Sequence, residues 1–429
     1  MRNAYALAAV LACAAGPLAA QTTAPVFTAY YSIGDSLAAG FESGSLVETH
    51  QVVSAPALIA RQAGVVDFQL PKVSEPGIPV ELHLQSLSPV PLIVPKSEKP
   101  GAPTNLALSR AYNNLAVPGA TLLDVGTRVT DNGGLHDLIL RGRGTQVQQT
   151  LAARPSVITL WMGNNDVLAA AVRGRAVDGV TLTPAADFRN QYLAIVTVLR
   201  TSGARIFAAN LPDVTSIPYV TTIAPVVVNP STGQPVLAGG QPVPLIGPAG
   251  PLPSGSLVTL GASSLLAQGI GIPTALGGRG TPLPDEVVLD PTELNIIKDR
   301  VNANNQAIAE ICQAAGIPVL DINAIMRDVA QNGRVIGGIT YTGAYLTGGI
   351  FSYDGVHPTD LGYAITANEW IRLLNASGAG LPEVDLLPFV GIATTVSASS
   401  RARVRPPAWE FPQETQDALL ALYPRLDER

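Results

Sequence analysis

The chain has 429 residues, of which 47% are apolar and 14% are charged, and its formal net charge is -6. This composition provides material for a large folded core and excludes a disordered chain. The acidic balance, without a run of lysine or arginine, excludes nucleic acid as a partner.

The first residues are typical of an export leader. A positively charged start is followed by an apolar stretch over 5–15 and then by small residues. This stretch is too short to anchor the chain across a bilayer. Two routes remain open: a signal peptide over 1–20, or a bacterial lipoprotein leader that ends before Cys13, which would then carry the lipid. We expect the protein to be secreted or periplasmic, or lipid-anchored to the membrane of the cell envelope.

The next elements alternate between strands and helices. Four short apolar runs, bounded by glycine, proline or polar residues, predict buried strands of a parallel sheet at 27–33, 157–162, 204–209 and 317–322. Apolar residues at helical spacing predict amphipathic helices at 188–199, 294–312 and 359–374. Strands that alternate with helices favour an α/β fold with a parallel sheet.

Two stretches rich in proline and glycine interrupt this alternation, at about 68–110 and about 214–284. The second carries a single charged residue, Arg279. Proline disfavours a regular helix there, and the apolar composition disfavours a solvated linker. We expect this stretch to be a packed insertion over the sheet, and a structural excursion unrelated to the functional site is the alternative.

These elements predict one domain over 25–387, with both insertions inside it. Residues 388–429 are polar and contain proline. We therefore expect them to form a C-terminal surface tail with a short helix near 413–422.

Cysteine and histidine give little support for a metal site. Once the leader is removed, Cys312 has no partner for an intrachain disulfide, and its helical surroundings predict a buried small hydrophobic residue. None of the histidines is paired with another at ligand spacing; they are His50, His83, His136 and His357. We expect neither a metal nor a cofactor.

The first predicted strand ends in residues that are unusual for a core segment, Gly34-Asp35-Ser36-Leu37. Such residues form turns, and an ordinary turn is one interpretation. The other is that the turn presents Ser36 as a nucleophile. A serine nucleophile needs a base, a group that orients the base, and hydrogen-bond donors for the oxyanion.

Three later segments contain residues of these kinds. Asp354 precedes His357 by three residues, so that its carboxylate can reach and orient the imidazole. Asn165 follows a strand and offers an amide donor, and Gly119 lets a backbone N–H approach a substrate. Each segment alone is also explained as a turn or a helix cap. Because the carboxyl ends of parallel strands share one edge of a sheet, we expect the segments to converge there.

In this order, the segments resemble the four sequence blocks of the SGNH hydrolases, also called GDSL esterases/lipases. The blocks are Gly34-Asp35-Ser36-Leu37, Gly119 within NLAVPGA, Gly163-Asn164-Asn165-Asp166 and Asp354-Gly355-Val356-His357. The resemblance covers residues 34–357 and implies a three-layer α/β/α fold with a flavodoxin-like parallel sheet. The two long insertions depart from the family pattern and leave the substrate open.

The resemblance also implies roles for the residues of these blocks. Ser36 would be the nucleophile, His357 the base and Asp354 the residue that orients it. The oxyanion hole would consist of the backbone N–H groups of Ser36 and Gly119 and the side chain of Asn165.

Asp35 and Asp166 would hold the loops of the site through hydrogen bonds. The implied activity is that of an exported serine esterase or lipase, which acts on a small-molecule or lipid ester through an acyl-enzyme. The apolar insertion at 214–284 favours lipid-like or short-to-medium acyl groups. The alternatives are a carbohydrate O-acetyl esterase and a non-catalytic envelope protein that binds lipid or glycan. The sequence does not indicate an oligomeric state.

Overall fold

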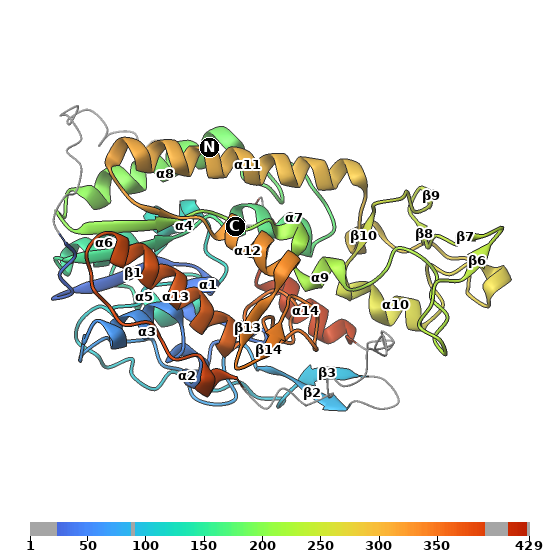
Figure 1. Cartoon of the computed structure of the whole chain (residues 1–429), viewed down its shortest axis with the longest axis horizontal. Helices are drawn as coiled ribbons and strands as arrows, with labels where there is room; N and C mark the ends of the chain where they lie inside the picture. The colour runs from blue at the N-terminus through green and yellow to red at the C-terminus, as the bar shows by residue number, and fades with distance from the viewer. Residues whose placement is uncertain (1–23, 87–90, 391–410, 427–429) are drawn as a thin grey trace.

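The central sheet is parallel and has four strands in the spatial order β1-β4-β5-β12 (Figure 1). The computed structural model describes residues 24–86, 91–390 and 411–426, so the predicted leader lies outside the described residues. The strands are β1 (Tyr30–Gly34), β4 (Val157–Trp161), β5 (Arg205–Ala209) and β12 (Val319–Leu320). All four predicted strands form, although β12 has only two residues.

A fifth segment extends the sheet beyond β1. Ser32 donates its N–H to Asn113 O at 2.8 Å and accepts from Leu115 N–H at 3.0 Å. The pairing is parallel, and it makes residues 113–117 the second segment of the sheet in chain order. The resulting order, 2-1-3-4-5, is that of flavodoxin-like sheets, in which ligands bind at the carboxyl ends of the two strands where the order reverses. Here those strands are β1 and β4.

Helices cover both faces of the sheet, which confirms the predicted α/β architecture (Figure 1). Residues that alternate along the strands supply the two faces. Ile33 and Ile206 pack into one apolar cluster with α6, α8 and α11, whereas Tyr30 and Phe207 pack into another with α3 and α13. These helices are α6 (Gln146–Ala152), α8 (Ala185–Arg200), α11 (Pro291–Ala315), α3 (Ala55–Gln62) and α13 (Asp360–Ala376).

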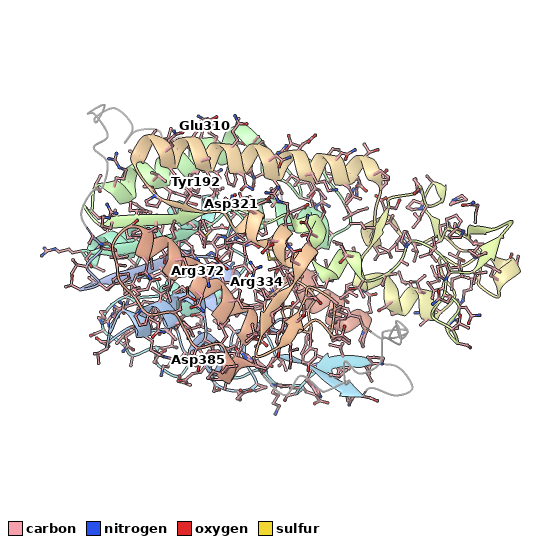
Figure 2. The ribbon with its side chains drawn as sticks, in the orientation of Figure 1. Tyr192, Glu310, Asp321, Arg334, Arg372 and Asp385 are labelled. Atoms are coloured by element: carbon pink, nitrogen blue, oxygen red, sulfur yellow. The ribbon has the colours of Figure 1, made fainter. Side chains whose placement is uncertain are left out.

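Further helices lie between these elements in the chain. They are α1 (Ser36–Ala39), α2 (Glu48–Gln51), α4 (Leu122–Thr127), α5 (Leu135–Leu140), α7 (Asn165–Val172) and α12 (Ile322–Asn332). Among the long helices, Tyr192 of α8 lies beneath α11, where its hydroxyl contacts Cys312 Sγ at 3.7 Å (Figure 2). Cys312 is buried, as the helical pattern predicted. Within the described parts of the chain, no helix has the length and apolar composition needed to cross a membrane.

The first insertion contains an antiparallel pair of strands, β2 (Leu82–Ser86) and β3 (Leu92–Pro95). Leu82 and Ile93 of this pair are buried in the main core. A further antiparallel pair, β13 (Arg334–Ile336) and β14 (Ile339–Tyr341), follows α12.

The second insertion forms a small lobe with a core of its own. Val227, Leu245 and Leu283 are buried against one another in a cluster separate from the two that flank the sheet. The lobe projects from one end of the molecule (Figure 1), so the expectation that it lies over the sheet was wrong. Other apolar residues of this insertion, such as Tyr219 and Leu260, are buried in the main core. Its elements are α9 (Pro218–Thr221), β6 (Leu237–Ala238), β7 (Gln241–Pro242), β8 (Ile246–Gly247), β9 (Gly250–Pro251), β10 (Leu257–Val258), α10 (Ser263–Ala267) and β11 (Val288–Leu289), which follows the insertion and pairs with β10.

The C-terminal segment, which contains α14 (Gln413–Ala421), packs into the protein. The expectation of a surface tail was therefore wrong for residues 411–426. Phe411, Leu419 and Tyr423 are at most 2% exposed and belong to the main apolar cluster. In Figure 1, α14 lies between the sheet domain and the lobe.

Candidate active site

Ser36 stands at the carboxyl end of β1, where it is the first residue of α1. Asp35 caps this helix, because its Oδ1 accepts the N–H of Leu37 at 3.0 Å. Gly34 is required in the turn, since a Cβ on it would lie 2.3 Å from the Cβ of Ala38. The close turn fixes the start of α1, so Ser36 has a defined position at the edge of the sheet.

Asp35 also joins the β1 turn to the β4 turn. Its Oδ2 accepts from Asn164 Nδ2 at 2.8 Å. Burial raises the pKa of Asp35 to about 6, and the hydrogen bonds from Asn164 and Leu37 act in the opposite direction. The sequence analysis gave Asp35 a supporting role but gave none to Asn164, because it assigned the amide donor of this block to Asn165.

The β4 turn places Asn165 as the first residue of α7. Its Nδ2 donates to Ala120 O at 2.8 Å, and an amide nitrogen has a second hydrogen for another acceptor. The turn depends on Gly163, which has φ +108°, and a Cβ there would lie 2.7 Å from the ring of Phe188. The side chain of Asn165 is therefore held at the edge where β1 and β4 end.

Asp166 connects the start of α7 to two other segments. Its Oδ2 accepts the N–H of Leu122, the first residue of α4, at 3.0 Å. Its Oδ1 accepts from Thr183 Oγ1 at 2.7 Å. These bonds hold the segment that contains Gly119, which precedes α4, close to the β4 turn. Gly119 has φ +80°, a conformation that favours glycine.

Asp354 and His357 form a fully buried pair in the loop before α13. His357 Nδ1 lies 2.7 Å from Asp354 Oδ2, which also accepts the N–H of Gly44 at 2.8 Å. Asp354 Oδ1 accepts the N–H groups of Val356 and His357, both at 2.8 Å. Because a carboxylate only accepts, Nδ1 carries the proton and Nε2 of the neutral ring is an acceptor.

These interactions set the charge of Asp354. Burial alone would raise the pKa of this carboxyl, but the charge of His357 and the hydrogen bonds hold the pKa below its ordinary value. Asp354 is therefore ionised at neutral pH and can stabilise an imidazolium at His357.

Tyr423 links Ser36 to His357, and the sequence gave no sign of this. Its hydroxyl lies 3.2 Å from His357 Nε2 and also hydrogen-bonds the side chain of Ser36. The structure thus brings Ser36 and the Asp354–His357 pair around one hydroxyl group. Burial raises the pKa of Tyr423 well above its ordinary value, so this hydroxyl keeps its proton.

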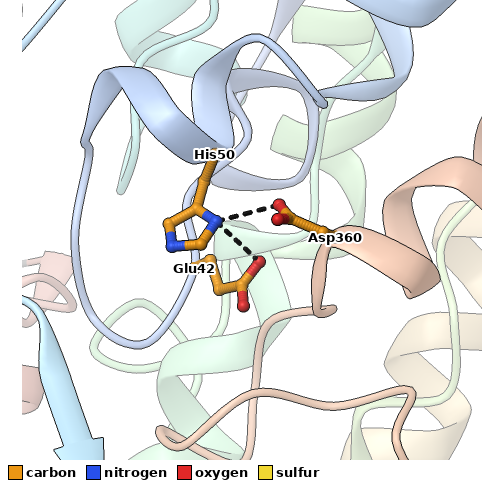
Figure 3. Close-up of side chains that lie close together, drawn as sticks. All are labelled: Glu42, His50 and Asp360. Atoms are coloured by element: carbon orange, nitrogen blue, oxygen red, sulfur yellow. Dashed lines mark hydrogen bonds and ion pairs between the residues drawn. The ribbon is translucent and has the colours of Figure 1, made fainter. Parts of the chain in front are cut away.

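A second cluster of titratable side chains lies near the loop that contains Asp354 and His357, and it consists of Glu42, His50 and Asp360 (Figure 3). His50 Nδ1 lies 2.8 Å from Asp360 and 3.3 Å from Glu42, and Nε2 lies 3.3 Å from Glu81. Burial alone would lower the pKa of His50, but the bonds to Asp360 and Glu81 raise it to about 11. A cation bound here would have to displace the proton of this imidazolium. We therefore interpret the cluster as an ion-pair network that ties the loop after α1 to α13.

A cleft of about 720 Å³ lies beside the loop that contains Asp354 and His357. Its lining is mostly apolar and comes from the β2–β3 pair, from Gly44, which hydrogen-bonds Asp354, and from Thr415 and Leu419 of α14. Tyr423 follows α14, so the C-terminal segment borders both the cleft and His357. The first insertion, rather than the second, contributes to this cleft.

Comparison with known protein families gives a match to one family model. The family model for GDSL-like Lipase/Acylhydrolase matches residues 30–370, which is more than half of the chain. No curated protein sequence matches.

Three solved structures that match this chain have low sequence identity and low TM-scores. A G-D-S-L family protein from Desulfitobacterium hafniense is 13% identical (TM-score 0.33; 80% of this chain and 98% of that chain covered). A catalytic mutant of the acetylxylan esterase Axe2 from Geobacillus stearothermophilus is 10% identical (TM-score 0.39; 85% and 99% covered). A lipase/acylhydrolase from Enterococcus faecalis is 14% identical (TM-score 0.34; 82% and 98% covered).

Proposed function

Because the chain belongs to the GDSL-like lipase/acylhydrolase family and is a carboxylic ester hydrolase, we propose that Ser36, His357 and Asp354 are its catalytic triad. One observation carries this proposal. The buried Asp354–His357 pair directs Nε2 toward a hydroxyl that also bonds Ser36. A nucleophile, a base and a group that orients the base are the three parts that acyl transfer through serine needs.

The reaction proceeds in two steps. Ser36 Oγ attacks the ester carbonyl while its proton passes to His357 Nε2, and the tetrahedral intermediate then releases the alcohol, which takes this proton. Water attacks the acyl-enzyme, gives a proton to His357 and releases the carboxylic acid, and the proton returns to Ser36. Asp354 holds the proton of Nδ1 in place and stabilises the imidazolium formed in each step.

The negative charge on the carbonyl oxygen is stabilised by donors at the same edge of the sheet. The backbone N–H groups of Ser36 and Gly119 and the second amide hydrogen of Asn165 are the donors in this proposal. Asp35 and Asp166 fix the loops that carry them, through the bonds to Asn164 and Leu122. Donors already in place do not have to reorganise when charge develops, which is why such sites accelerate acyl transfer.

We propose an ester with a lipid-like or medium-length acyl group as the substrate. The cleft beside the catalytic loop supports this proposal, because Leu82, Val94 and Leu419 are among its lining residues. An apolar chain in such a cleft gains about 0.8 kcal/mol for each CH₂ group that is buried. We also propose that the protein is exported, on the basis of the leader pattern in residues 1–20.

The test is hydrolysis of p-nitrophenyl esters from acetate to palmitate by the purified protein without its leader. We expect kcat/KM to rise with acyl length up to a medium chain, and Val94→Arg, at a half-buried lining residue, to reduce this rise without a similar effect on acetate. Ser36→Ala is the control for background hydrolysis. A strict preference for acetate, retained by Val94→Arg, would contradict the acyl assignment and favour a carbohydrate O-acetyl esterase.

A further inference from the structure

The C-terminal segment, residues 411–426, occupies the catalytic centre. The hydroxyl of Tyr423 bonds both His357 Nε2, at 3.2 Å, and the side chain of Ser36. When the imidazole ring is neutral, Nε2 is an acceptor, so that Tyr423 donates to it and takes the place of a serine or substrate hydroxyl. The base and the nucleophile are thus both engaged by a residue of the same chain.

The same segment also reaches the proposed oxyanion hole. The carbonyl oxygen of Leu422 lies 2.7 Å from the position that a Cβ on Gly119 would take. A carbonyl oxygen at this place is chemically similar to the ester carbonyl that the site would bind. Two adjacent residues, Leu422 and Tyr423, therefore cover the two halves of the site.

Specific contacts hold the segment in this position. Arg173, which follows α7, donates from Nε to Tyr423 O at 2.6 Å and from its NH2 group to Leu420 O at 3.1 Å. These carbonyls lie at the end of α14, where a cation is favourable. Leu426 donates its N–H to Val180 O at 2.7 Å.

The start of the segment is fixed to the lobe. Phe411 N donates to Ser263 Oγ at 3.1 Å, and the ring of Phe411 packs edge-on against Tyr219 at 6.4 Å. The amide of Gln416 lies against Gly261, since a Cβ on this glycine would lie 2.2 Å from Gln416 Nε2. The segment is thus held at both ends, by the lobe and by the loop after α7.

The catalytic residues are closed to solvent in this arrangement. Ser36 is 3% exposed and His357 is 0% exposed. An ester has to contact both, so the segment must move before substrate can bind. The family match ends at residue 370, which places residues 411–426 outside the part of the chain that the family model covers.

We propose that residues 411–426 are an autoinhibitory segment, whose Tyr423 and Leu422 occupy the substrate position and whose release activates the enzyme. This inference rests on the proposed triad. The observed activity is then the activity of the released enzyme multiplied by the fraction of molecules in which the segment is released, so that weaker anchoring raises activity.

The test uses two substitutions in the full chain without its leader. Arg173→Gln removes the bonds to the end of α14, and Tyr423→Phe removes the hydroxyl that engages Ser36 and His357. We measure kcat/KM for p-nitrophenyl acetate and the rate at which phenylmethylsulfonyl fluoride modifies Ser36. We expect both rates to rise at least tenfold in Arg173→Gln, since charge-assisted hydrogen bonds are lost, and about three- to tenfold in Tyr423→Phe.

Each substitution has a matched control outside the segment. Arg141 also holds backbone carbonyls, donating to Leu108 O and Arg110 O at 2.6 Å each, so Arg141→Gln controls for the loss of such a clamp. Tyr192→Phe removes another buried hydroxyl. Neither control should raise the two rates. Hydrogen exchange of peptides within 411–426 should become faster in Arg173→Gln and Tyr423→Phe but not in the two controls, which separates release of the segment from general destabilisation.

The outcomes distinguish the two proposals. If the wild type hydrolyses the ester through Ser36 but both variants have rates equal to or below the wild-type rates, the segment is not inhibitory and the triad stands. A loss of activity in Tyr423→Phe would instead make Tyr423 a supporting residue of the site and would contradict the inference. If no protein shows hydrolysis or modification at Ser36, the triad fails, and the inference fails with it.

Discussion

The substitution Asp354→Asn tests the buried pair at the centre of the site. Both carboxylate oxygens accept two or more hydrogen bonds, with Oδ2 bonded to His357 Nδ1 and Gly44 N–H, and Oδ1 bonded to Val356 and His357 N–H. An asparagine amide nitrogen would face two donors in either orientation. An unsatisfied buried donor costs about 1–3 kcal/mol, so two cost about 2–6 kcal/mol of the free energy of unfolding.

In Asp354→Asn, the decrease in kcat should be larger than the decrease in folded protein can explain. Without the carboxylate, His357 is free to carry its proton on Nε2, which can then no longer accept from the nucleophile. The same change in a serine protease triad lowers kcat about 10⁴-fold. We expect a loss of the order of 10³–10⁴ in kcat for p-nitrophenyl esters, measured per folded molecule after urea unfolding has defined the folded fraction.

The control is Asp131→Asn, which alters a similar aspartate–histidine pair outside the catalytic loop. Asp131 Oδ2 bonds His136 Nδ1 at 3.0 Å and also accepts the N–H of His136 at 2.9 Å. This variant should lose stability but keep kcat within about twofold. If Asp354→Asn keeps more than a tenth of the wild-type kcat, the reasoning about the imidazole proton is refuted.

The remaining predictions concern Asn165, Asp35, Gly163 and Asp354. Asn165→Ala should lower kcat about 10²–10³-fold with little change in KM, in steady-state assays; an effect on KM alone would contradict an oxyanion role. Because the pKa of Asp35 is raised to about 6, the free energy of unfolding of the wild type should fall by about 3 kcal/mol as pH rises from about 4 through 6. Asp35→Asn should remove this decrease, as measured by urea unfolding at pH 4 and 8. Gly163→Ala should cost about 1–3 kcal/mol in the same assay, because of φ +108° and the contact with Phe188. The lowered pKa of Asp354 stabilises the fold above about pH 4, and this stability should fade at lower pH in the wild type but not in Asp354→Asn.

The sheet could be predicted from the sequence because its strands are short apolar runs buried on both faces. The segment at 113–117 was not predicted, because Asn113 and Asn114 interrupt its short apolar run. In the structure their amides bond the backbone, with Asn113 Nδ2 donating to Tyr30 O and Asn114 Nδ2 to Ala38 O. Polar side chains in a buried strand are satisfied by tertiary contacts that a local pattern does not contain.

The candidate site could be predicted as far as its four blocks, each of which lies at the end of a strand or before a helix. The role of Tyr423 could not, because its partners are 66 or more positions away in the chain. Leu419 and Tyr423 are four positions apart, which indicates one buried face of a helix. This spacing does not indicate which residues that face contacts. The position of the lobe could not be predicted either. Its apolar composition indicates that it is packed, but not that it packs around a core of its own.

The ion-pair network at His50 was also beyond prediction. Its partners Glu42, Glu81 and Asp360 come from three separate segments, and only Glu42 is near in sequence. A histidine alone in a polar stretch gives no local sign of such partners.

The most direct test of the proposed triad is mass spectrometry of the protein after reaction with a fluorophosphonate. We expect one adduct, on the peptide that contains Ser36, to form in the wild type, to be absent from Ser36→Ala and to form far more slowly in His357→Ala. An adduct on another residue, or ester hydrolysis that persists in Ser36→Ala, would contradict the assignment of Ser36 as the nucleophile.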